Sequence, residues 1–163
     1  MNYKIVVDSC CDLTEELKQS GVFQVIPLTL QVGDAFIVDD ETFDQAAFLK
    51  TVRECPDCPK SACPSPDQYK TAYEGDEDMI FVVTLSQHLS GSYNSAVLAK
   101  NLYIEDHGED KQIHIFSSDS AACGETLIAM KLRELADQGK TFEEIVEEAA
   151  YFRDHMLTYF VLE

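Results

Sequence analysis

The feature that most constrains the fold of this chain is a strand-to-helix turn near its middle, Leu85–Ala96. The turn follows the run Met79–Val83, which is apolar throughout and is typical of a buried strand. Behind the turn, Val97–Ala99 and Leu102 recur at the spacing of a helix. Gly91 lies at the tightest point. The sequence therefore predicts a buried strand that passes through a tight turn into a helix.

This turn reads Leu-Ser-Gln-His-Leu-Ser-Gly-Ser-Tyr-Asn-Ser-Ala and is rich in hydroxyl groups. The first turn of a helix has free backbone N–H groups, which favour an anion. A P-loop has a lysine at this place, whereas this turn contains neither Lys nor Arg. Hydroxyls and amides without a cation suit a singly charged head group, such as a carboxylate, better than a polyphosphate.

Strand-like runs alternate with helical patterns along the chain, and they occupy Tyr3–Val7, Phe23–Val32, Met79–Val83 and Ile113–Phe116. This alternation predicts an α/β fold with a mainly parallel sheet and helices on both of its faces. The Gly33-Asp34 dipeptide separates two short apolar runs and predicts a β-hairpin near residues 28–38. We therefore expect one α/β domain with a small antiparallel addition.

Capping patterns mark four helix starts, namely a cap at Asp12 or Thr14, the pairs Thr42–Gln45 and Thr141–Glu144, and Ser65 before Pro66. A further long helix is expected from about Glu125 to Gly139. At the end of the chain, Leu157–Glu163 has the pattern of a strand with nothing after it. We therefore expect this chain to be truncated.

Ligands of parallel α/β sheets bind beyond the carboxyl ends of the strands. Three polar loops should meet there, with Asp8 and Ser9 in the first, Ser90 in the second and Ser118 in the third. The loop around Ser61 contains several prolines, which force an extended path, and it could cover the other three. We expect Asp8, Ser9 and Ser118 to support a ligand held mainly by the Ser90 turn.

The charge of the chain excludes several classes of partner. It has 163 residues, of which 30 are acidic and 12 basic, for a formal net charge of −18. Such a chain should repel nucleic acid and anionic membrane surfaces. It has no segment apolar enough to span a membrane and no evident secretory signal, so we expect a soluble, cytoplasmic protein. Its six cysteines should then be reduced thiols.

Two chemical alternatives concern the hydroxyl-rich turn. A nucleophilic serine at Ser90 with His88 as its base would make the chain a hydrolase or transferase, but the motif Gly-x-Ser-x-Gly lacks its first glycine here. A flavodoxin-like phosphate site is also open, although no phosphate fingerprint is present. Replacing Ser90 by Ala separates the first alternative from a binding role, because an enzyme would lose turnover and a carrier would lose affinity.

The cysteines raise a third alternative. Cys55 and Cys58, with Cys63 nearby, have the beginning of a zinc spacing, but no second pair or histidine completes the site. Cys10 and Cys11 follow Asp8 and are either reactive thiols or small residues packed under a turn, and we favour the second interpretation. The sequence predicts neither a metal site nor a cofactor.

Four motifs, in their order and spacing, resemble the DegV family of bacterial proteins. They are Asp-Ser-Cys-Cys-Asp-Leu at Asp8–Leu13, Val-Ile-Pro-Leu at Val25–Leu28, Lys60–Pro66, and Leu89–Ala96. The resemblance extends over the whole chain, which corresponds to the N-terminal domain, at residues 1–163. It implies that the C-terminal domain of the family is absent from this chain.

The resemblance also implies a function, because members of the family bind a long-chain fatty acid, such as palmitate, without catalysis of their own. Some present it to a fatty acid kinase, which makes an acyl phosphate. Transferred by motif, Ser61 and Ser90 would hold the carboxylate, and Gly91 and Ser92 would add backbone N–H groups. An open face left by the missing domain could instead support self-association, or make the chain an interaction fragment without a ligand.

The chain departs from the family pattern at two loops. In the loop around Ser61 the family usually has Thr-Ser-Gln-Pro-Ser, and Cys63 takes the place of the amide side chain here. The loop at Ser117 usually begins Asp-Ser in the family, and Thr126 stands where the family has a glycine. The resemblance therefore implies a head-group pocket with altered side chains.

Overall fold

A computed structural model gives the fold of the protein and describes residues 2–159 and 161. Its elements are, in order, β1 (Tyr3–Asp8), α1 (Glu15–Gln19), β2 (Phe23–Ile26), β3 (Thr29–Val32), β4 (Ala35–Val38), α2 (Gln45–Glu54), β5 (Lys60–Ala62), α3 (Pro66–Ala72), β6 (Met79–Thr84), α4 (Ser92–His107), β7 (Gln112–Ser117), α5 (Cys123–Asp137) and α6 (Phe142–Asp154).

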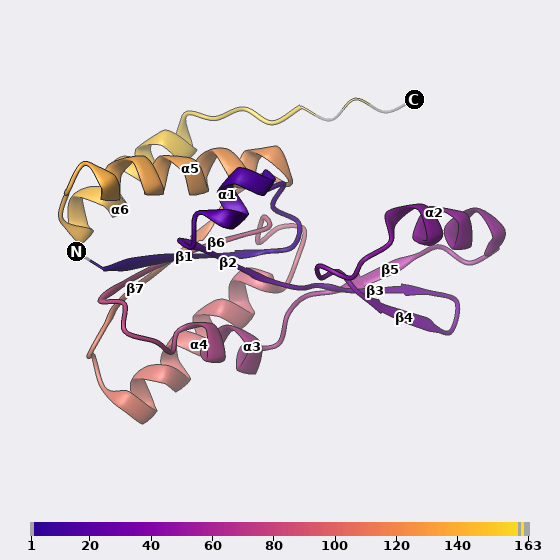
Figure 1. Ribbon diagram of the computed structural model, residues 1–163, viewed down its shortest axis with the longest axis horizontal. Coiled ribbons are helices and arrows are strands. Elements are labelled where there is room, and N and C mark those ends of the chain that lie inside the picture. Colours follow the sequence, from indigo (N-terminus) through magenta and orange to yellow (C-terminus); the bar gives the residue numbers. More distant parts are fainter. Residues whose placement is uncertain (1, 160, 162–163) are drawn as a thin grey trace.

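The main sheet has the strand order β2-β1-β6-β7, and all of its neighbouring strands pair in parallel. Helices α1, α5 and α6 cover one face and α3 and α4 cover the other (Figure 1). Every residue of β6 is buried, because this strand lies between two others and under helices on both sides. The predicted α/β fold, with a mainly parallel sheet between helical layers, is confirmed.

Two apolar cores lie on the two faces of this sheet. On one face, Phe81 and Val83 of β6 pack with Ile128 and Leu132 of α5. On the other face, Ile80 and Val82 of the same strand pack with tyrosines and alanines of the opposite layer, Tyr69, Tyr73, Tyr103, Ala96 and Ala99. Alternate residues of one strand therefore supply both cores, as the period of a strand requires.

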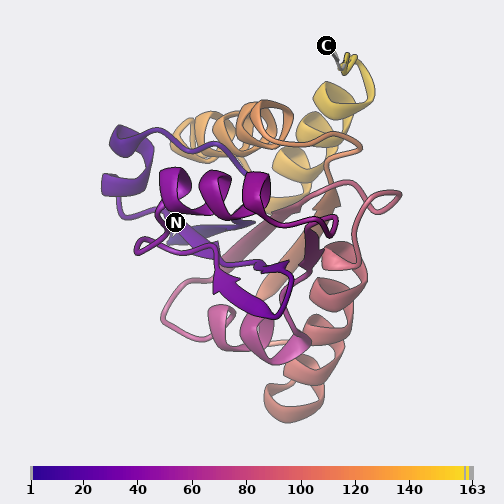
Figure 2. The same cartoon turned by 90° about the vertical axis from the view of Figure 1, so that its right-hand side faces the viewer.

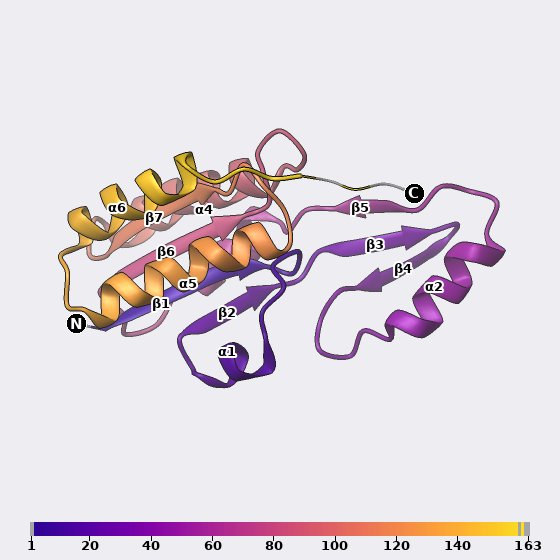
Figure 3. The ribbon, with the colours of Figure 1, turned by 90° about the horizontal axis from the view of Figure 1, so that it is seen from above.

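A second, antiparallel sheet has the order β4-β3-β5 and includes the predicted hairpin, whose turn is Gly33-Asp34. With α2 it extends away from the main sheet (Figure 3), and Figure 2 views the molecule from the side of this extension. The strand β5, which contains Ser61, was not predicted as a strand. It pairs with β3 from Gln31 to Thr29, so the proline-rich segment is partly sheet.

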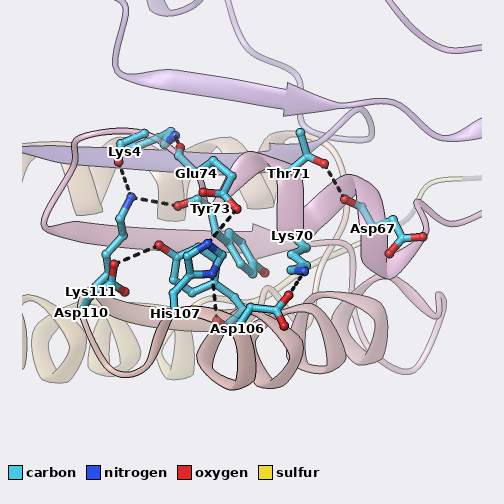
Figure 4. Close-up of polar contacts among 12 residues, drawn as sticks. Lys4, Asp67, Lys70, Thr71, Tyr73, Glu74, Asp106, His107, Asp110 and Lys111 are labelled. Atoms are coloured by element: carbon cyan, nitrogen blue, oxygen red, sulfur yellow. Dashed lines mark hydrogen bonds and ion pairs between the residues drawn. The ribbon is translucent and has the colours of Figure 1, made fainter.

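Polar contacts close the layer formed by α3 and α4 at the amino end of the main sheet (Figure 4). Lys111, just before β7, donates to the carbonyls of Tyr73 and Gly75 at 3.1 and 2.6 Å. Lys70 of α3 pairs with Asp106 of α4. These contacts lie toward the amino ends of the strands, whereas the loops with the candidate site lie at the carboxyl ends.

Three of the predicted helix starts agree with the structure, with caps at Thr14, Ser65 and Thr141. The Thr42 capping box is wrong, because Thr42 donates to Asp40 and α2 begins after the cap Asp44. The predicted C-terminal strand is also wrong for Leu157–Tyr159, which belong to no strand, and residues 160, 162 and 163 lie outside the described residues. Among the helices of the described part, none is long and apolar enough to cross a membrane.

Candidate functional site

The three polar loops that follow β1, β6 and β7 are joined by hydrogen bonds. The backbone N–H of Leu85 donates to Asp8 Oδ2 at 2.9 Å. The N–H of Gln87 donates to Ser117 Oγ at 3.0 Å, and that of Ser86 donates to the carbonyl of Ser120 at 3.0 Å. The expected convergence at the carboxyl ends of the strands is therefore present, and the loop with Ser90 lies between the other two.

The Ser90 turn is held by its own backbone and hydroxyl groups. The N–H of Ser90 donates to the carbonyl of Ser86 at 3.0 Å, and the N–H of Ser92 donates to Ser90 Oγ at 3.1 Å. The hydroxyls of Ser90 and Ser92 are 3.0 Å apart. Gly91 is the N-cap of the 16-residue helix α4 and provides no side-chain cap, so apart from the Ser92 N–H bonded to Ser90 the first turn has no side-chain partner in the part of the chain that the structure describes. The arrangement offers hydroxyl and amide donors at the positive end of a helix.

Cys63 connects the segment with Ser61 to this turn. Its Sγ lies 3.9 Å from Ser95 Oγ, and a Cβ added at Gly91 would lie 3.0 Å from the same sulfur. Ser61, two residues earlier on β5, is exposed. The structure therefore places the segment of Ser61 against the Ser90 turn, although contact between the two serines themselves stays a prediction.

The expected supporting residues differ in what their side chains do. Asp8 is fully buried and accepts backbone N–H groups from both Leu85 and Cys10. Ser9 Oγ accepts the N–H of Leu28, which fixes the link between β2 and β3. The hydroxyl of the buried Ser118 is hydrogen-bonded to the backbone of Ser120. Asp8, Ser9 and Ser118 therefore shape the loops, and their contact with a ligand stays a prediction.

The carboxyl of Glu125 is a functional group that the sequence patterns do not identify. This residue, in the first turn of α5, is fully buried, and neither of its oxygens has a hydrogen-bond partner in the described structure. Burial, followed by the charge of nearby Asp8, raises the pKa of Glu125 to about 9. Burial also raises the pKa of Asp8. A glutamate at a helix start resembles an ordinary first-turn acid, so the sequence gives no sign of its burial.

Asp8, Cys10 and Glu125 form the one group of donor atoms within residues 2–159 whose spacing could suit a metal, with all three atoms within 4.8 Å of one another. Burial raises the pKa of the Cys10 thiol to about 12, so in the absence of a metal ion this thiol is protonated at neutral pH. In the same residues, Cys55 and Cys58 belong to no such group.

The geometry also bears on the nucleophilic-serine alternative. Ser90 Oγ is paired with Ser92, and no hydrogen bond in the described part of the chain joins it to the ring of His88. His88 is exposed, and its backbone N–H donates to Ser86 Oγ. The serine and histidine therefore lack the contact through which a base activates a nucleophile.

The fold and the site place the protein in the class of parallel α/β domains that have hydroxyl and amide hydrogen-bond donors at a strand-to-helix turn. Comparisons with known proteins identify its family. The family model described as "Uncharacterised protein, DegV family" matches residues 2–163. A DegV domain-containing protein from Streptococcus pneumoniae is 44% identical over 165 residues. That alignment covers 99% of this chain and 58% of the relative. The chain belongs to the DegV family, and it spans little more than half the length of the curated relatives it matches.

Solved structures show the same fold. A DegV-family protein from Ruminococcus gnavus, refined with vaccenic acid, has a TM-score of 0.91 at 48% identity. The match covers 93% of this chain and 54% of that one. The fatty acid kinase B3 protein of S. pneumoniae, loaded with linoleic acid, has a TM-score of 0.83 at 42% identity. That match covers 94% of this chain and 55% of the neighbour.

Proposed function

We propose that this chain is the fatty-acid-binding domain of a carrier, and that it binds the carboxylate of a long-chain fatty acid at the Ser90 turn. The observation that carries the proposal is the open N-terminus of α4, where the Ser90 and Ser92 hydroxyls meet without a cation nearby in the turn. Related DegV-family structures contain vaccenic, linoleic or heptadecanoic acid. The uncharged donors of the turn suit a carboxylate, and each of these ligands has one.

In this proposal Ser61 and Ser90 donate their hydroxyls to the carboxylate and Gly91 adds its backbone N–H. Ser92 adds its own backbone N–H by exchanging its bond to Ser90 Oγ for one to the ligand. The acyl chain leaves the site along exposed apolar side chains, of which Leu89 lies directly beside Ser90 and is 65% exposed. The domain carries out no catalysis and needs no cofactor other than its bound fatty acid. The kinase named in the S. pneumoniae neighbour supports presentation of the fatty acid to a fatty acid kinase in the cytoplasm.

The affinity of this chain by itself should be low. Burial of a methylene group contributes about 0.8 kcal/mol, so losing half the burial of a palmitate chain costs roughly 6 kcal/mol. In this proposal a longer relative covers the acyl chain from a second side and therefore binds it more tightly. The exposed apolar residues on and near the small sheet, Val25, Phe36, Val38 and Leu49, support self-association as an alternative way to cover that chain. Light scattering with and without palmitate would detect such dimers.

The test compares palmitate with the corresponding fatty alcohol, which has the same chain but no carboxylate. The native protein should prefer palmitate, because the turn offers donors to a negative charge. A charged hydrogen bond contributes about 1.5–3 kcal/mol, so Ser90→Ala should weaken palmitate binding about tenfold or more and reduce the preference. Asn101→Ala, an exposed change in the same helix but away from its first turn, is the matched control. Equal affinity for acid and alcohol in the native protein would overturn the proposal.

A further inference from the structure

A pair of buried carboxyl groups lies directly under the Ser90 turn. Asp8, at the end of β1, and Glu125, at the start of α5, are both fully buried, and their oxygens lie within 4.8 Å of each other. In residues 2–159, no Lys, Arg or His forms an ion pair or a hydrogen bond with either group. Two negative charges this close, buried away from solvent, would repel strongly.

The groups that face this pair do not neutralise it. Cys10, from the loop after β1, and Tyr69, from α3, are close and are neutral at physiological pH, because burial raises the pKa of both. Cys11, on the same loop, is neutral for the same reason. The hydroxyl of Ser92 on α4 and the backbone of Ala122 are further polar neighbours of the pair, and both are uncharged. A single proton is therefore the simplest way to remove one of the two charges.

The hydrogen bonds show which carboxyl group would hold that proton. Asp8 accepts the N–H groups of Leu85 and Cys10, and both bonds favour its ionised form. Among the described residues, Glu125 has no hydrogen-bond donor for either oxygen. Once protonated, it lies close enough to donate to Asp8. Because Asp8 accepts two N–H groups and Glu125 accepts none within the described part of the chain, we assign the proton to Glu125.

We propose that Asp8 and Glu125 share one proton at neutral pH, and that this proton-bridged pair positions the Ser90 turn for an anionic head group. The bridge keeps Asp8 in place to bind Leu85, the first residue of the turn, and to accept the hydroxyl of Ser92. With the Ser92 hydrogen directed to Asp8, the hydrogen of Ser90 makes the 3.0 Å bond between the two hydroxyls, and an anionic ligand would draw it away from Ser92. Glu125 is thus a positioning residue, and its effect on the ligand rests on the proposed function.

The direct test is a pH titration of the side-chain carboxyl carbons by NMR in the protein without ligand. The Glu125 carboxyl should stay protonated through neutral pH and ionise only near pH 9. Ionisation of both Glu125 and Asp8 below pH 6 would overturn the proposal. A stoichiometric metal ion in the purified protein, found by elemental analysis and bound at these residues, would overturn it as well.

The pH dependence of the free energy of unfolding provides a second test, because a Glu125 that only fills space would not make stability depend on pH in this way. Between pH 5 and 8 the folded chain holds one proton that the unfolded chain has released, so the native protein loses stability as the pH rises. Glu125→Gln keeps a donor but cannot ionise. Its folded-to-unfolded ratio, relative to the native protein, should therefore rise about tenfold per pH unit. A ratio that does not depend on pH would contradict the shared proton.

Glu105→Gln is the control, because this exposed change on α4 also removes one carboxyl group but should leave the ratio nearly independent of pH. The effect on the ligand is tested with palmitate at pH 7, where Glu125→Gln should bind more tightly than Glu125→Ala, which has no donor for Asp8. Equal binding by these two variants would overturn the positioning role. If the native protein binds no palmitate, the proposed function fails, while the carboxyl titration still decides whether the proton is shared.

Discussion

Gly91 lies where two distant segments of the chain, the Ser90 turn and the segment of Cys63, approach each other closely. Its φ of −76° is open to any residue, so its backbone does not require glycine. The requirement is spatial, since a Cβ here would lie 3.0 Å from Cys63 Sγ. The proline-rich segment can therefore approach the Ser90 turn this closely only because position 91 has no side chain.

Gly91→Ala should consequently destabilise the protein by about 1 kcal/mol, the usual cost of slight overcrowding. In a Cys63→Ala background the same change should cost less, because the sulfur that the new methyl group meets is gone. Urea unfolding of the four proteins of this double-mutant cycle measures the difference. A coupling energy below about 0.5 kcal/mol would show that the two positions are independent.

The sequence predicts the donors of the candidate site but not the buried carboxyl group beneath them. Ser90 and Gly91 can be found because a local pattern of strand, turn and helix places them. Glu125 cannot, since its burial depends on Asp8, which is far away in the sequence and comes close only through the stacking of α5 on β1. Local patterns identify donors on a turn, but they give no information about the groups packed beneath it.

Among the elements, α2 differs most from the rest of the fold. It has ten residues, and none of its side chains is buried, whereas all six residues of β6 are. Its start was also predicted wrongly, because Asp40 binds Thr42 before the helix begins. The starts of α3 and α6 were predicted correctly, because Ser65 and Thr141 form capping boxes within their own four residues. The sequence is a reliable guide where an element is stabilised by its own residues.

The exposure of α2 predicts low local stability. Its amides should exchange with deuterium much faster than those of β6, because opening α2 exposes little apolar surface. Hydrogen exchange with mass spectrometry measures both segments in one experiment. The control is α4, another surface helix, which buries Ala96 and Ala99 and should exchange slowly in its middle. Exchange in α2 as slow as in α4 would contradict this account of the small sheet and its helix.

On the scale of the whole molecule, the same parallel sheet stabilises the fold and brings the site together. Its four strands end at one edge, where the loops after β1, β6 and β7 bind one another through Asp8, Ser86 and Ser117. The alternation of strands and helices predicts this convergence from the sequence. The projection of the small sheet beyond that edge was not predicted, because the pairing of β3 with β5 joins segments that have no common local pattern.

The central claim is that the Ser90 turn binds a fatty acid by its carboxylate, and native mass spectrometry of the purified protein, followed by lipid extraction, tests it most directly. Because the affinity of this chain by itself should be low, the purified protein should be recovered at most partly occupied by a long-chain fatty acid, and the double variant Ser61→Ala, Ser90→Ala should be recovered without it. Added palmitate should likewise bind the native protein and not the variant. Equal occupancy of the two proteins, or no binding by the native protein even with added palmitate, would contradict the claim.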